Sequence, residues 1–138
     1  MKAQLHLTLH NDVQEIPLLA SFIDELCEDN GLDMSITMNL NLAMEEAVVN
    51  VMNYAYPQGT VGDIDIDALF EEGMLTFVIS DSGTPFDPTQ NETPDITLDA
   101  DDRPIGGLGI FLVRNIMDHI EYQYKDHKNI LTLSKKIS

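Results

Sequence analysis

The chain has 138 residues, and its 24 acidic residues against seven basic ones give a formal net charge of −17 at pH 7. This length suits one globular domain over residues 1–138, and so large an acidic excess excludes the basic surface that nucleic acid or an anionic membrane would need as a partner. Since no apolar run approaches the ~20 residues of a membrane span and Cys27 is the only cysteine, we expect a cytoplasmic protein with no intrachain disulfide.

The first elements change from an alternating pattern to a helical one. Residues 4–10 alternate between apolar and polar side chains, which predicts a β-strand. From Asp12 to Asn30 the apolar residues recur at helical spacing and predict a helix, with Pro17 in its first turns and Gly31 after its end.

A second helix is predicted to run to about Tyr54. Either Asp33 or Ser35 can cap its N-terminus, because both side chains accept a hydrogen bond from a backbone N–H of the first turn. Pro57 and Gly59 then stop the helical pattern.

Three polar side chains lie close together around this second helix. At about 100° per residue, Glu46, Asn50 and Asn53 fall within one narrow sector of an otherwise apolar segment, EEAVVNVMNYAY. The stripe is either a solvated helix face or the wall of a site. Glu45 points about 100° away from Glu46, so we expect it to be solvated or structural.

The second half of the chain adds two hairpins and one helix. GDIDIDALF alternates, EEG turns the chain and MLTFVIS follows, which predicts a β-hairpin. After an aperiodic loop over residues 82–105, a helix is predicted near GGLGIFLVRNIMD, and HIEYQYK and NILTLSKK form a closing hairpin across Asp126–Asn129. This order predicts an α+β fold: a two-layer sandwich of a mostly antiparallel five-stranded sheet with three helices on one face.

Two apparent metal motifs do not meet the requirements of their sites. A calcium loop starting at DIDIDALFEEGM would need glycine and glutamate where the chain has Ala68 and Met74. The histidines offer no ligand pair, since His6 and His10 would lie ~13 Å apart along a strand. We therefore expect no transition-metal site.

Two loop segments carry chemistry that suits a nucleotide. GGLG at 106–109 is neither a P-loop nor a dinucleotide fingerprint, for which Leu112 would have to be glycine. Such glycines are often only a turn, but before a helix they also offer free N–H groups to phosphate. The loop 82–105 is long enough to be a lid, with a disordered insertion as the alternative. At its start, in DSGTPFDP, Asp81 can accept a hydrogen bond from an exocyclic amine and Gly83 lets the backbone approach a flat ring.

In this order, EEAVVNVMNYAY, DSGTPFDP and GGLGIFLVRNIMD resemble the N, G1 and G2 boxes of the GHKL (histidine kinase-like, Bergerat-fold) ATP-binding superfamily. The chain resembles more closely the bacterial anti-sigma factor serine/threonine kinases, over nearly its whole length. The resemblance implies ATP or ADP and Mg²⁺ as cofactors. It also implies a kinase that phosphorylates a STAS-domain anti-anti-sigma protein and sequesters a sigma factor or similar regulator.

The resemblance assigns roles to individual positions. Glu46 would be the general base, Asn50 would bind Mg²⁺, and Asp81 would accept a hydrogen bond from the adenine amine. Gly83 would keep the adenine pocket open, and residues 87–105 would form a lid over ATP. The implied nucleotide-binding positions are Asn50, Asn53, Asp81, Gly83, Phe86, Arg103, Gly106, Gly107, Leu108, Gly109 and Asn129.

Some positions depart from the family pattern. Members often carry a histidine near Tyr54 and a Gly-Thr pair where this chain has Lys128 and Asn129. We expect Asn129 to substitute in part for the threonine in its adenine contacts. Arg103 is the lid's sole arginine and hence its candidate for stabilising charge on a transferred phosphoryl group.

Two other functions remain open from the sequence: a non-catalytic protein-binding switch gated by nucleotide, and the detached catalytic domain of a histidine kinase. The histidine kinase domain lacks support, because the sequence shows no phospho-accepting histidine in an adjacent dimerisation helix. Leu7 and Leu9 add apolar surface on the first strand and family members commonly dimerise, so we also expect a homodimer.

Overall fold

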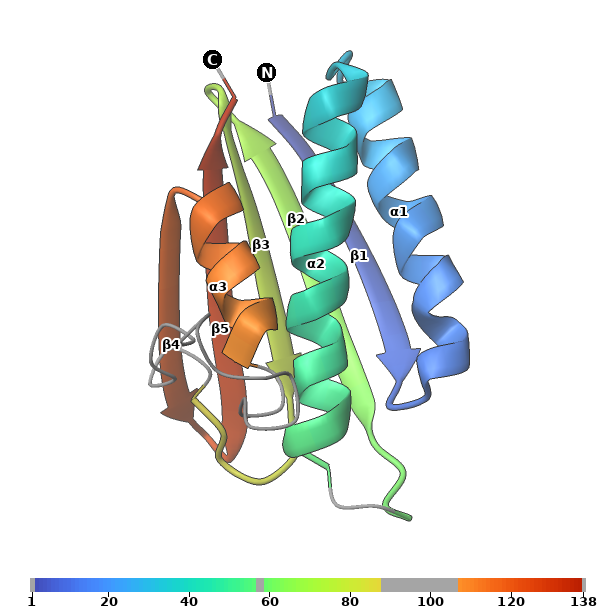
Figure 1. Ribbon diagram of the computed structural model, residues 1–138, viewed down its shortest axis with the longest axis vertical. Helices are drawn as coiled ribbons and strands as arrows, with labels where there is room; N and C mark the ends of the chain where they lie inside the picture. The colour runs from blue at the N-terminus through green and yellow to red at the C-terminus, as the bar shows by residue number, and fades with distance from the viewer. Residues whose placement is uncertain (1, 57–58, 88–106, 138) are drawn as a thin grey trace.

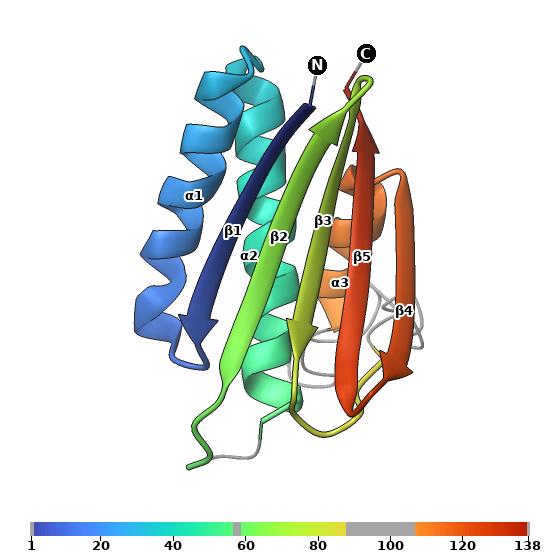
Figure 2. The ribbon, with the colours of Figure 1, turned by 180° about the vertical axis from the view of Figure 1, so that it is seen from behind.

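Three helices cover one face of a five-stranded antiparallel sheet (Figure 1). The computed structural model describes residues 2–56, 59–87 and 107–137. The strand order is β1-β2-β3-β5-β4, and no helix of these described ranges lies on the opposite face of the sheet (Figure 2). The predicted fold class is therefore confirmed. In chain order the elements are β1 (Lys2–His10), the 3-10 helix η1 (Val13–Glu15), α1 (Ile16–Asp29), α2 (Met34–Tyr54), β2 (Asp63–Glu71), β3 (Met74–Asp81), α3 (Gly107–Ile116), β4 (His119–Lys125) and β5 (Lys128–Lys136).

The helix ends follow from local capping. The single helix predicted from Asp12 is in fact two. The Asp12 side chain accepts from the N–H of Gln14 and caps the start of the short η1, and α1 follows with a proline in its first turn. At the start of α2, Asp33 rather than Ser35 is the N-cap, and its carboxylate accepts from the N–H of Ile36 over 2.9 Å. The Ser35 hydroxyl donates to the same carboxylate and supports the cap.

The alternation in the strands sets which side chains enter the core. Ile64, Ile66 and Ala68 are fully buried under the helices, as their spacing predicts. On the opposite face of the same strands, the Asp67 carboxylate lies 2.6 Å from Nδ1 of His6 on the neighbouring strand. The core therefore lies between one sheet face and the helix layer.

The closing hairpin is tighter than the predicted turn across Asp126–Asn129. Its two turn residues, Asp126 and His127, both have positive φ angles, of 56° and 64°, as a two-residue hairpin turn requires. Lys128 and Asn129 consequently belong to β5, where Asn129 pairs in register with Asp81 on β3. This register decides the composition of the site.

Two sequence-based expectations concern the outside of the fold. Leu9 is fully buried and Leu7 packs half-buried against the same core, so these residues give no reason for a homodimer, which stays a prediction. Most of the predicted lid, with Arg103 and Gly106, lies outside the described residues. None of the described helices is both long and apolar enough to cross a membrane.

Candidate functional site

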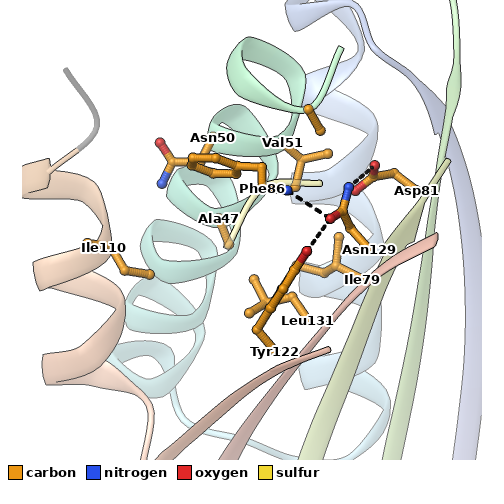
Figure 3. Close-up of a pocket in the computed structure, with 11 residues that line it drawn as sticks. Ala47, Asn50, Val51, Ile79, Asp81, Phe86, Ile110, Tyr122, Asn129 and Leu131 are labelled. Atoms are coloured by element: carbon orange, nitrogen blue, oxygen red, sulfur yellow. Dashed lines mark hydrogen bonds between the residues drawn. The ribbon is translucent and has the colours of Figure 1, made fainter. Parts of the chain in front are cut away.

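A pocket opens between α2, α3 and the sheet, at the end of β3 (Figure 3). Its walls are mainly apolar, and its polar groups come from α2, β3, β4 and β5, which are brought together only by the fold. It is lined by Ala47, Asn50, Val51, Ala55, Ile79, Asp81, Phe86, Ile110, Tyr122, Asn129 and Leu131. An apolar pocket with a few convergent polar groups is the usual form of a small-molecule site.

Asp81 is the last residue of β3 and is 3% exposed. Its Oδ1 accepts two hydrogen bonds, from the backbone N–H of Gly83 over 2.8 Å and from Nδ2 of Asn129 over 2.9 Å. Neither bond reaches Oδ2, so this oxygen can accept from a donor on a ligand as far as the described residues are concerned. Burial raises the pKa of the Asp81 carboxyl above its ordinary value, because the charged form loses hydration, and the two hydrogen bonds oppose that shift.

Asn129 is 4% exposed and uses its whole side chain on protein partners. Besides its bond to Asp81, Nδ2 donates to the carbonyl oxygen of Thr84 over 2.8 Å. Its Oδ1 accepts from the backbone N–H of Phe86 over 3.0 Å and from the Tyr122 hydroxyl over 2.5 Å. Asn129 therefore joins three strands of the sheet, β3, β4 and β5, to the segment that follows β3.

Asn50 and Glu46 lie one turn apart on α2. Asn50 is 4% exposed and lines the pocket, and its Nδ2 has no hydrogen-bond partner among the described residues. A buried amide without a partner carries a free-energy cost, which a bound ligand can remove. Glu46 is half-buried beside the pocket without lining it, whereas Glu45 is exposed, as expected from their different directions on the helix.

Gly83 is required for a different reason from the predicted one. It does not line the pocket; instead it packs against the end of α2, where an added Cβ would lie 2.3 Å from the carbonyl oxygen of Ala55. The same oxygen accepts from the backbone N–H of Thr84 over 2.6 Å and from its hydroxyl over 3.0 Å. Gly83 thus allows the segment after β3 to dock on α2.

We expect Gly83→Ala to lower the free energy of unfolding by about 1–3 kcal/mol, because backbone on both sides of the contact must move to admit the methyl group. Thermal unfolding followed by circular dichroism measures this loss. Ser82→Ala, an exposed neighbour, is the control and should change stability by less than about 0.5 kcal/mol. A Gly83→Ala protein as stable as the parent would show that the segment does not depend on this contact.

The remaining predicted positions divide into two groups. Phe86 lines the pocket and its ring stacks on Tyr54 with centroids 5.1 Å apart. Gly107 begins α3, so the backbone N–H groups of Gly107, Leu108 and Gly109 belong to its first turn, where N–H groups lack helical partners. Asn53, by contrast, is exposed and lines a separate hollow near His10, away from the pocket.

Some pocket residues were not found from the sequence. Tyr122 on β4 and Ile110 on α3 line the pocket, and the Tyr54 hydroxyl is buried without a hydrogen-bond partner among the described residues. In the sequence Tyr122 is one of several residues of an alternating strand. The β4–β5 register sets it opposite Leu131, from where its hydroxyl reaches Asn129 diagonally, and this register was not predicted.

The described residues fit an adenine nucleotide with Mg²⁺. Apolar walls suit a purine ring, Asp81 Oδ2 can accept from its amine, and the start of α3 suits phosphate. No cluster of three or more metal-binding side chains occurs in the described ranges, and Asn50, to which the family resemblance assigns Mg²⁺, lines the pocket. Mg²⁺ commonly binds through one or two protein groups together with substrate phosphates.

Comparison with known proteins identifies the family of the chain. Residues 9–135 match the model of the histidine kinase-like ATPase domain family. The chain is 30% identical over 105 residues to the serine-protein kinase RsbW of Listeria monocytogenes, an alignment that covers 73% of this chain and 67% of that protein. It is 31% identical over 99 residues to the serine/threonine-protein kinase BtrW of Bordetella bronchiseptica, covering 72% and 70% respectively.

A solved structure shares the fold. The crystal structure of the RsbU and RsbW domains of a Mycobacterium tuberculosis protein superposes with a TM-score of 0.70 over 98% of this chain, at 16% identity. This chain spans 32% of that longer chain. On the family match and the two kinases, the chain belongs to the histidine kinase-like ATPase family, on the branch that holds RsbW and BtrW.

Proposed function

We propose that this chain is an ATP-dependent serine/threonine protein kinase that phosphorylates a STAS-domain anti-anti-sigma protein and also binds a sigma factor or similar regulator. The observation that carries the proposal is the meeting, in one pocket, of the buried Asp81 carboxylate, which accepts at Oδ1 from Gly83 and Asn129, and the buried Asn50 amide, whose Nδ2 has no partner among the described residues. The names of the relatives RsbW and BtrW support the reaction class.

In this proposal the pocket holds the nucleotide by its two ends. Asp81 accepts a hydrogen bond from the adenine amine, with Ile79 and Leu131 among the apolar walls around the ring. Asn50 binds Mg²⁺ through its amide oxygen, and the first turn of α3 donates N–H groups to phosphate. Mg²⁺ neutralises phosphate charge, which a chain of net charge −17 otherwise repels.

Glu46 takes the proton in the transfer step. The partner's serine or threonine oxygen forms a bond to the γ-phosphorus of ATP, the bond from that phosphorus to its bridging oxygen breaks, and ADP leaves. The hydroxyl proton passes to the Glu46 carboxylate, which is one helical turn from Asn50 and half-exposed to an approaching protein. A partner with basic residues suits the acidic surface.

Two measurements test the proposal in sequence. Calorimetry on the folded protein should detect ATP and ADP binding that requires Mg²⁺, and its absence would overturn the nucleotide assignment itself. Incubation with labelled ATP, Mg²⁺ and a STAS-domain protein should then transfer label to a serine or threonine of that protein. Nucleotide binding and partner binding without any transfer would instead support the nucleotide-gated switch.

A further inference from the structure

The amide of Asn129 has one orientation that its surroundings permit. The two groups facing Oδ1 are the Phe86 N–H, which can only donate, and the Tyr122 hydroxyl (Figure 3). The two groups facing Nδ2 are the carbonyl oxygen of Thr84 and the Asp81 carboxylate, which in its ionised form can only accept. A flipped amide would set donor against donor and acceptor against acceptor.

This arrangement leaves no hydrogen-bonding group of the Asn129 side chain for a ligand. An asparagine amide has two donor hydrogens and two strong acceptor directions, and four protein groups take all of them. The expectation that Asn129 replaces a threonine in contacting adenine is therefore not supported by the geometry. What Asn129 does contact is Asp81 and the segment 84–86 that borders the pocket.

We infer that Asn129 is a positioning residue that sets adenine selectivity through Asp81 without a hydrogen bond of its own to the nucleotide. The inference rests on the proposed function, since it concerns how the same pocket recognises ATP. By donating to Oδ1, Asn129 fixes the rotation of the Asp81 carboxylate so that Oδ2 is the oxygen presented to the ligand. Its bonds to Thr84 and Phe86 hold the adjoining segment in place.

The substitution Asn129→Asp separates the donor bonds of this side chain from its acceptor bonds. Aspartate has nearly the same shape and keeps the acceptor for Phe86 and Tyr122, but when ionised it loses both donor bonds and sets a second carboxylate against Asp81. Protonation of the pair restores one donor bond. Among the described residues, the ionisable groups around this pair are Asp87 and the tyrosines 56, 122 and 124, and burial raises the pKa of the Tyr56 and Tyr122 hydroxyls, which favours their neutral form.

The readout is selectivity for ATP over inosine triphosphate, which lacks the exocyclic amine, measured by calorimetry between pH 6 and pH 8.5. The parent should prefer ATP throughout. At pH 8.5 Asn129→Asp should bind ATP about tenfold or more weakly than the parent and lose most of its selectivity, and the deficit relative to the parent should shrink toward pH 6. A substitution that only destabilised the fold would weaken the binding of both nucleotides alike, and its deficit would not shrink toward pH 6.

Two further variants serve as a control and as an independent test. Asn39→Asp adds the same charge at an exposed position of α2 and should bind both nucleotides as the parent does. Tyr122→Phe removes one donor to Oδ1 and should lower selectivity by about threefold in the same direction, even where Asn129→Asp does not fold. A parent that binds no ATP would overturn the proposed function. A parent selective for ATP, with Tyr122→Phe and a folded Asn129→Asp equally selective, would overturn this inference alone.

Discussion

Replacing Glu46 by glutamine is expected to slow phosphotransfer to the partner protein by about 10²–10⁴-fold while leaving the Kd for ATP within about twofold of the parent. Glutamine keeps the shape and the hydrogen-bonding reach of the side chain but cannot take the hydroxyl proton. Glu46 is not among the residues that line the pocket, so we expect the substitution to spare nucleotide binding. Single-turnover transfer of labelled phosphate, with ATP binding measured separately, resolves the two effects.

Glu45→Gln is the matched control, because it makes the same chemical change at the next residue of the same helix. Glu45 is exposed and lies on another side of α2, so its replacement should change the transfer rate by less than about threefold. Equal losses in the two variants would mean that the effect comes from surface charge, and the assignment of Glu46 as the base would then be wrong.

Asp81→Asn is expected to weaken ATP binding by about a hundredfold or more. The amide can still accept from Gly83 and Asn129 through its oxygen, and its NH₂ group then takes the place of Oδ2. A donor there faces the donor of the adenine amine, so a charge-assisted hydrogen bond is replaced by two unpaired donors. The binding free energy of ATP should therefore fall by about 3 kcal/mol. Calorimetry with ATP and Mg²⁺ measures the change in Kd.

The same substitution should leave the protein without ligand at least as stable as the parent at neutral pH. Because the pKa of Asp81 is raised in the folded state, the folded protein binds a proton at this carboxyl more tightly than the unfolded chain does. The stability from this group is therefore present in acid, below its unfolded pKa, and is lost as pH rises through the folded pKa. The difference in melting temperature between Asp81→Asn and the parent should grow with pH. An unfolded variant would contradict this prediction.

Much of the fold could be predicted because its signals are local. The alternation of Ile64 and Ile66 predicts a buried strand face, which the structure confirms. The polar residues before the apolar helical pattern predict a cap at Asp33 or Ser35, and the structure selects Asp33. The order of the elements was then enough to predict one sheet with helices on one side. The strand register was not predicted, since it depends on pairings between distant segments.

The parts of the site that sequence reasoning misplaced depend on that register and on packing. Asn129 was expected to contact adenine, but the β3–β5 register sets it opposite Asp81, where its amide is fully used. Gly83 was assigned to the pocket, whereas its close neighbour is the carbonyl of Ala55, at the end of a helix 28 residues earlier in the chain. Helical angle alone grouped Asn53 with Asn50, although Asn53 lies one turn further along and faces another hollow.

β5 is the last strand of the chain, yet it lies inside the sheet, between β3 and β4. Asp81 and Asn129 are 48 positions apart, so the bond between them closes a long loop. Such contacts form late in folding, because the chain loses conformational entropy on closing the loop before the contact stabilises it. During synthesis, α2 can be complete while the pocket residues of β5, among them Asn129, are still missing. We therefore expect the emerging polypeptide to capture nucleotide only after β5 has left the ribosome and inserted between its two neighbours.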